Sequence, residues 1–173
     1  ILDEYDGWTF CQIQYNYMDI NFQAGLEGLQ YAAAKNLGVV IMEPLLGGKL
    51  AIDLPAVQPI WNSAATKRKP ADWALQWVWN QPEVSVVLSG MSTLEQVKEN
   101  LVSADRSKPY LLTNEELGLF DEARETLKNL RPIPCTDCKY CLPCPNEVNI
   151  PLNFETYNRV AMYDDIEIGR AHV

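Results

Sequence analysis

Three short apolar segments, each followed by a segment with helical periodicity, constrain the fold of this chain more than any other feature. The apolar segments are residues 10–16, 39–42 and 84–88, and the periodic segments after them are residues 23–36, 70–78 and 92–102. The second apolar segment, Val-Val-Ile-Met, is continuous and largely β-branched, as expected for a strand buried on both faces of a parallel sheet. Three strand–helix units predict an α/β fold with a parallel sheet. Periodicity alone does not separate an open sheet from a closed barrel.

Two sequence signals mark the starts of helices in the second half of the chain. Ser92 and Glu95 have the spacing of a capping box, in which a hydroxyl and a carboxylate three residues apart satisfy the first N–H groups of a helix. Thr113 and Glu116 repeat this spacing and predict a long amphipathic helix that ends before Pro132. The residues between the second apolar segment and Pro70 are rich in glycine and proline, which predicts a loop.

Composition narrows the class of protein. The 173 residues are 47% hydrophobic, which is enough for one buried core, and the formal net charge is −9. A field of that sign repels nucleic acids and anionic lipids, and no apolar run is long enough for a membrane span. The first residues carry acidic side chains and no basic signal-peptide region, so we expect a cytoplasmic protein. The start at Ile1 rather than methionine suggests that an upstream part is missing.

Four of the five cysteines lie within ten residues near the C-terminal end. Cys135, Cys138, Cys141 and Cys144 are each separated by two residues, and Pro145 follows the last one. Bacterial ferredoxins hold iron–sulfur clusters with the run C-x2-C-x2-C-x3-C-P, which differs only in the last gap. The spacing therefore predicts a 4Fe-4S cluster with Cys144 closing a single site. We divide the chain into residues 1–131, an α/β unit, and residues 132–173, a helical, cysteine-rich, ferredoxin-like tail with a further helix from Pro151.

Zinc is the main alternative ligand for the cysteine cluster. Structural zinc sites usually join two C-x2-C pairs across a spacer of a dozen or more residues, and that spacer is missing here. Disulfides would close very short loops and gain little stability. Cys11 stands alone in the first apolar segment, so we interpret it as a small buried hydrophobic residue outside the site.

Four stretches together resemble one family: FCQIQYN, VVIMEPLLGGKL, VVLSGMSTLEQVKEN and CTDCKYCLPCP. They resemble the last three strand–helix units of aldo/keto reductases, in the branch that adds a ferredoxin-like tail. The resemblance implies the C-terminal part of a TIM (β/α)8 barrel, with about three of eight units present. It places the catalytic residues of the family on earlier strands, so none is assigned here. Tyr15, Tyr17 and Lys49 are not substitutes for them, and His172 is interpreted as a solvated tail residue.

The resemblance implies several residues that bind a nicotinamide dinucleotide. Gln12 matches the glutamine that hydrogen-bonds the nicotinamide carboxamide, and Pro44 and Leu45 match the loop that lies along the dinucleotide. Gly90 and Ser92 match a turn where a residue without a side chain and a helix start can approach a phosphate.

The adenine end of the implied cofactor site departs from the family pattern. Gln96, Glu99 and Asn100 match the residues facing the adenine, and their spacing puts them on one helical face. Met42 stands where many relatives have an aromatic ring, and Gln96 where others use an arginine on the 2'-phosphate. The nearby cations are Lys49 and Lys98. NADP is the family expectation, and NAD stays open.

The resemblance implies an oxidoreductase that, when intact, passes hydride between a nicotinamide and a small carbonyl or alcohol, with the cluster relaying electrons to a partner or stiffening the tail. A nicotinamide sensor or partner-binding subunit is the alternative. A three-strand sheet leaves edges unpaired, so a homodimer is a further expectation.

Overall fold

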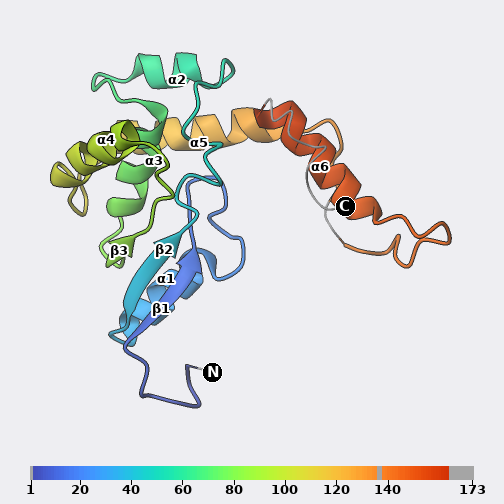
Figure 1. Cartoon of the computed structure of the whole chain (residues 1–173), viewed down its shortest axis with the longest axis horizontal. Coiled ribbons are helices and arrows are strands. Elements are labelled where there is room, and N and C mark those ends of the chain that lie inside the picture. Colours follow the sequence, from blue (N-terminus) through green and yellow to red (C-terminus); the bar gives the residue numbers. More distant parts are fainter. Residues whose placement is uncertain (1, 136–137, 164–173) are drawn as a thin grey trace.

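The computed structural model describes residues 2–135 and 138–163 (Figure 1). Its order of elements follows the predicted alternation of strands and helices, with three helices more than the α/β units require. The elements are β1 (Phe10–Gln14), α1 (Gly25–Ala34), β2 (Gly38–Met42), α2 (Gln58–Ser63), α3 (Pro70–Trp79), β3 (Val86–Val87), α4 (Leu94–Asp105), α5 (Asn114–Asn129) and α6 (Ile150–Tyr163).

The three strands form the parallel sheet that the sequence predicts, and the structure gives their order as β1-β2-β3. Gln12 pairs with Val40, and Val40 pairs with Val86. Because side chains alternate along a strand, the sheet has two different faces. Val39 and Ile41 on one face are fully buried in the core. The opposite face is more open, and large apolar side chains such as Val86 are exposed on it.

Two elements differ from the sequence prediction. The predicted strand 84–88 is regular only over two residues, although the N–H groups of Ser85 and Leu88 still donate to carbonyls of β2 on either side. The predicted loop before Pro70 contains α2, which buries Ile60 and Trp61. Pro59 lies in the first turn of α2, where proline is tolerated because that N–H needs no helical partner, so a loop signal concealed a helix.

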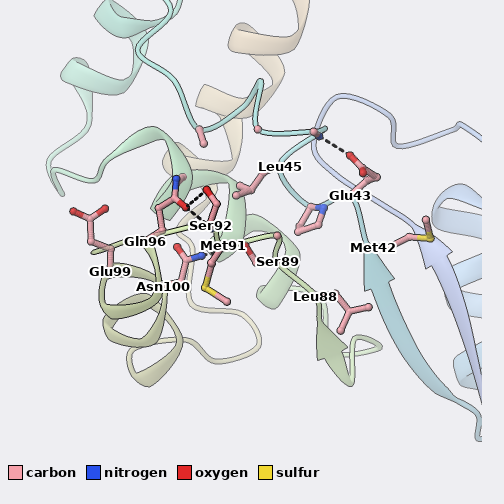
Figure 2. A pocket seen from close by; sticks show the side chains of 16 residues that line it. Met42, Glu43, Leu45, Leu88, Ser89, Met91, Ser92, Gln96, Glu99 and Asn100 are labelled. Carbon is pink, nitrogen blue, oxygen red and sulfur yellow. Dashed lines mark hydrogen bonds between the residues drawn. The ribbon is translucent and has the colours of Figure 1, made fainter. Parts of the chain in front are cut away.

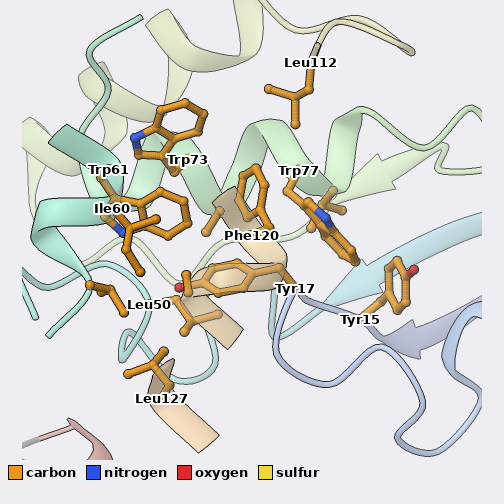
Figure 3. Close-up of a cluster of buried hydrophobic side chains, with 14 of the residues drawn as sticks. Tyr15, Tyr17, Leu50, Ile60, Trp61, Trp73, Trp77, Leu112, Phe120 and Leu127 are labelled. Atoms are coloured by element: carbon orange, nitrogen blue, oxygen red, sulfur yellow. The ribbon is translucent and has the colours of Figure 1, made fainter. Parts of the chain in front are cut away.

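The core is an aromatic cluster centred on Phe120 of α5 (Figure 3). The centroid of its ring lies 5.4 Å from that of Tyr17, 5.2 Å from Trp61, 5.7 Å from Trp73 and 6.4 Å from Trp77. These rings come from the loop after β1 and from α2 and α3. Phe120 of α5 therefore joins its own helix to three other segments. Aromatic pairs at such distances add to the free energy of burial.

The start of α5 carries the predicted capping box. The hydroxyl of Thr113 accepts a hydrogen bond from the Glu116 N–H at 3.2 Å, and the Glu116 carboxylate accepts from the Thr113 N–H at 3.1 Å. The same carboxylate pairs with Arg68, whose guanidinium lies 4.3 Å from the centroid of the Trp73 ring. The helix start is thereby tied to the aromatic core.

The capping box predicted for α4 is wrong by one residue. Thr93, not Ser92, is the N-cap, and the reciprocal partner is Gln96 rather than Glu95. Two hydroxyl residues stand next to each other here, so the sequence alone offers two registers. The side chains of Ser92 and Gln96 nonetheless interact, as described below.

The tail docks on the rest of the chain through the last turn of α6, next to the C-terminal end of α5 (Figure 1). Met162 and Tyr163 are buried in the core cluster. Asn158 is also buried, and its amide both accepts from the N–H of Ile133 at 3.0 Å and donates to the carbonyl of Ile133 at 2.7 Å. The predicted tail residue His172 lies outside the described residues. Among the described helices, none has the length and apolar character needed to cross a membrane.

Candidate functional site

A pocket of about 840 Å³, here called the strand-end pocket, lies at the carboxyl ends of β2 and β3 (Figure 2). Ligands of parallel α/β folds bind at this end of the strands, because the loops that follow the strands and the starts of the next helices meet there. The lining residues are Met42, Glu43, Pro44, Leu45, Gly47, Gly48, Ala51, Ala71, Leu88, Ser89, Gly90, Met91, Ser92, Gln96, Glu99 and Asn100.

Seven of the eight residues that the sequence assigns to the cofactor line this pocket. They are Pro44, Leu45, Gly90, Ser92, Gln96, Glu99 and Asn100. The eighth, Gln12, is outside the lining, but its amide Nε2 lies 3.2 Å from the sulfur of Met42, which does line the pocket. The structure thus brings together residues that are up to 56 positions apart in the sequence, from Pro44 to Asn100. Their role in binding a cofactor stays a prediction.

The loop after β2 is held in an unusual conformation. Glu43 has φ +55°, and its carboxylate accepts a hydrogen bond from the N–H of Gly47. Its carbonyl accepts from the amide of Asn16 at 3.1 Å, and Asn16 is fully buried. Gly47 and Gly48 have φ +62° and +87°, a region that suits residues without a side chain. Positive φ at a non-glycine residue is a cost that the surrounding bonds offset, and such residues gather at functional sites.

Glycines leave open space on both sides of the pocket. A Cβ atom placed on Gly48 or on Gly90 would meet no other atom within 4 Å. Both residues line the pocket, so a ligand could approach the backbone closely at these points. Asn100 is fixed by a hydrogen bond from its amide to the hydroxyl of Ser89 at 3.1 Å. The pocket therefore suits a dinucleotide in volume and in access to the backbone.

At the start of α4, the side chain of Gln96 in the first turn accepts hydrogen bonds from the residues before the helix. The amide oxygen of Gln96 accepts from the N–H of Ser92 at 2.8 Å, from the Ser92 hydroxyl at 3.2 Å and from the N–H of Thr93 at 3.2 Å. Ser92 belongs to the turn that the family resemblance assigns to an approaching phosphate. Glu99, one turn later, is ion-paired with Lys69 of the segment before α3.

The two tyrosines excluded as catalytic residues are buried in the core, at 1% and 2% exposure for Tyr15 and Tyr17. Burial raises the pKa of Tyr15 to about 12, with a smaller contribution from Glu83. Burial also raises the pKa of Tyr17, assisted by Tyr163. Neither residue lines the strand-end pocket. Cys11 is half-buried against the core, and burial raises the pKa of its thiol, in keeping with an apolar role.

A second pocket of about 810 Å³ lies between the loops after β1 and β2 and the tail. It adjoins the strand-end pocket, because Glu43 and Gly47 line both. Arg131, Arg159 and Lys49 are among its charged residues. Sequence analysis missed this pocket, since no sequence pattern indicates where α6 docks.

The four clustered cysteines are not arranged as the predicted ligand set. Cys138 and Cys141 are exposed, and Cys135 and Cys144 are half-buried. Over residues 2–135 and 138–163, no three cysteine, histidine or acidic side chains lie close enough together to hold a metal ion. The structure therefore does not support the expectation that the thiols converge, and the cluster stays a prediction. The donor type suits iron or zinc, but the arrangement does not, because the loop has no core that would impose one geometry on it.

The sequence model of the aldo/keto reductase family matches residues 2–125, which is most of the chain. The chain belongs to the aldo/keto reductase family. This membership agrees with the position of the strand-end pocket, and the match stops before the cysteine loop.

Two relatives show how much of the family fold the chain covers. It is 28% identical over 134 residues to L-galactose dehydrogenase of Arabidopsis thaliana, a match that covers 68% of this chain and 41% of the plant enzyme. Its structure resembles the holo form of an aldo-keto reductase from Bacillus halodurans with a TM-score of 0.54 and 24% identity, over 70% of this chain and 44% of the bacterial one. The second similarity concerns the fold. The chain spans less than half the length of both relatives.

Proposed function

We propose that this chain is the nicotinamide-binding part of an aldo/keto reductase that transfers hydride between a nicotinamide dinucleotide and a small carbonyl or alcohol. The observation that carries the proposal is the strand-end pocket, which gathers seven of the eight residues assigned from the family resemblance. Family membership supports the reaction class. The catalytic residues of the family are expected on strands before Phe10, so the activity belongs to the whole protein.

In this proposal the bound nicotinamide supplies the hydride, and residues of the chain hold it in place. Gln12 would bind the carboxamide, because an amide offers both a donor and an acceptor. Pro44 and Leu45 would lie along the dinucleotide, in a loop fixed by the Asn16–Glu43 and Glu43–Gly47 hydrogen bonds. Gly90 would let the backbone approach the phosphates.

Titration of residues 1–173 with reduced nicotinamide dinucleotides tests this proposal. We expect a rise in nicotinamide fluorescence on binding and no turnover with aldehydes, because no catalytic residue is assigned to this chain. Gly90→Leu should abolish binding without unfolding, since its side chain would enter the pocket rather than neighbouring atoms. Gly118→Leu is the matched control: it also points into open space but lies on α5, outside this pocket. Absence of binding, or equal binding by the two variants, would overturn the proposal.

A metal-binding tail is the second candidate function. Four cysteines at intervals of two residues favour it, with a 4Fe-4S cluster ahead of zinc because the zinc spacer is missing. Binding one centre would require the thiols to move closer together than they lie in this structure. An electron-transfer partner and a cytoplasmic location would accompany the cluster, since free thiols persist in a reducing compartment.

Anaerobic purification with analysis for iron, sulfide and zinc tests the tail. A cluster predicts about four iron atoms per chain and a visible charge-transfer band, both lost in Cys138→Ser. Cys11→Ser is the control, because Cys11 belongs to β1 rather than to the cysteine loop. One zinc without iron would replace the cluster with a structural zinc site, and no metal at all would remove this candidate.

A further inference from the structure

The strand-end pocket is acidic. Among the described residues, its lining contains two carboxylates, Glu43 and Glu99, and no lysine or arginine. Of the two lysines that the sequence offers as nearby cations, Lys98 is exposed outside the lining. Lys49 lines the adjoining second pocket, and its ammonium lies 3.8 Å from a Cβ placed on Gly47, at the border with Glu43 rather than at the start of α4. Lys98 is two residues from Gln96, and side chains two residues apart on a helix point to different sides.

The cation nearest the start of α4, Lys69, is already compensated by acidic neighbours. Lys69 is ion-paired with Glu99, and Glu95 and Asp53 add to the negative field around it. The hydrogen bond to Glu99 and these charges raise the pKa of Lys69 above its ordinary value. An additional anion at this place would have to compete with the Glu99 carboxylate for the ammonium group.

The backbone at the start of α4 offers little to an anion either. The Gln96 amide accepts from the N–H of Ser92 (Figure 2) and from that of Thr93. The first turn of α4 also carries the carboxylate of Glu95. A phosphate would have to displace the Gln96 amide and lie near two acidic side chains, Glu95 and Glu99. Both effects weaken the attraction that a free helix start would exert.

Building on the proposed function, we infer that the strand-end pocket takes NAD(H) in preference to NADP(H), with Gln96 and Glu99 as the residues that discriminate. The 2'-phosphate of NADP(H) adds a charge of about −1.5 to −2 at neutral pH, and the pocket repels it. A ribose 2'-hydroxyl carries no charge and can donate a hydrogen bond to a carboxylate such as that of Glu99. The pocket therefore departs from the NADP expectation of the family resemblance.

Calorimetric titration of the 173-residue chain with NADH and with NADPH tests this inference. We expect NADH to bind roughly tenfold more tightly, a ratio that like charges at a partly exposed site can produce. Glu99→Gln removes one carboxylate and releases Lys69, and Gln96→Arg adds a guanidinium, so each should strengthen NADPH binding and reduce the ratio toward one. Glu122→Gln, an equal loss of charge on the exposed surface of α5, should leave the ratio unchanged. Added salt should also reduce the ratio of the unmodified chain.

The possible outcomes separate this inference from the proposed function. NADPH binding as tightly as NADH to the unmodified chain would overturn the inference and leave the proposed function standing. If the ratio of NADH to NADPH affinity is the same in the Glu99→Gln variant as in the unmodified chain, the assignment of the discriminating residues is overturned. Failure of both dinucleotides to bind would overturn the proposed function and the inference together. If Gln96→Arg unfolds through loss of its cap, as circular dichroism would reveal, Glu99→Gln decides the question alone, because its side chain makes no helix-capping bond.

Discussion

The α/β part of the chain, residues 2–131, and the described tail, residues 132–135 and 138–163, are held together in different ways. The α/β part packs aromatic rings from several segments around Phe120, so its stability is spread over many contacts. The tail depends on four buried residues of α6, namely Pro151, Asn158, Met162 and Tyr163, and its cysteine loop is mostly exposed. Burial of apolar surface favours one arrangement of the chain. An exposed loop needs a bound metal or a cross-link to adopt one arrangement.

This difference also separates the kinds of function that each part can carry. The strand-end pocket joins loop residues after β2 and β3 to residues of β2, α3 and α4, which are regular elements packed in the α/β part. The thiols stand on a loop whose geometry a metal would have to impose. Coupled folding and metal binding of this kind is common in small metal-binding segments.

The largest expected effect is the loss of the ring at the centre of the core. Phe120→Ala should reduce the free energy of unfolding by about 4 kcal/mol, because the cavity would separate rings from the loop after β1, α2 and α3. Tyr140→Ala, a similar truncation in the tail at a ring that is 94% exposed, should change it by less than about 0.5 kcal/mol. Urea unfolding followed by tryptophan fluorescence measures both. Comparable effects would show that the two parts do not differ as described.

The next effect concerns the Arg68–Glu116 ion pair at the start of α5 and depends on pH. Burial alone would raise the pKa of the Glu116 carboxyl, but hydrogen bonds from Arg68 and Thr113 outweigh it and hold the pKa below its ordinary value. A carboxyl with a lowered pKa in the folded state stabilises the fold above its ordinary pKa, and this contribution is lost as the pH falls through the folded value. Glu116→Gln should cost about 2 kcal/mol at pH 7 and progressively less below about pH 4.5. A cost independent of pH would contradict the role of the charge.

A smaller and more local effect should follow release of the tail. Asn158→Ala leaves the N–H and carbonyl of Ile133 without their partner, so opening of the tail should become easier by about 1–2 kcal/mol while the core is unchanged. Hydrogen exchange of α6, compared with that of α3, measures the difference. Asn153→Ala on the exposed side of the same helix, which removes only a bond to the Asn149 carbonyl, is the control. Equal loss of protection in α3 would show that the tail and the core unfold together.

The sequence predicts best those features that burial determines. The parallel sheet, the helix after Pro70 and the Thr113–Glu116 box are all present, because apolar periodicity and hydrogen-bond geometry act locally. The lining of the strand-end pocket follows from the family resemblance rather than from periodicity. Three features were missed for physical reasons. One proline in its first turn concealed α2, and the position of α6 depends on tertiary contacts. The spacing of cysteines specifies ligands only when a metal brings them together.

The smallest effect distinguishes two adjacent hydroxyls at the start of α4. Thr93→Ala should destabilise the chain by about 1 kcal/mol, because the N–H of Gln96 loses its acceptor at 3.2 Å. Ser92→Ala removes only a hydroxyl that donates to an amide oxygen with two other donors, so its effect should stay within about 0.5 kcal/mol. Thermal unfolding of the two variants side by side measures the difference. If Ser92→Ala is the more costly change, then the capping register expected from the sequence holds in solution, the Gln96 amide is released from the N–H groups of Ser92 and Thr93, and the start of α4 is free to receive a phosphate after all.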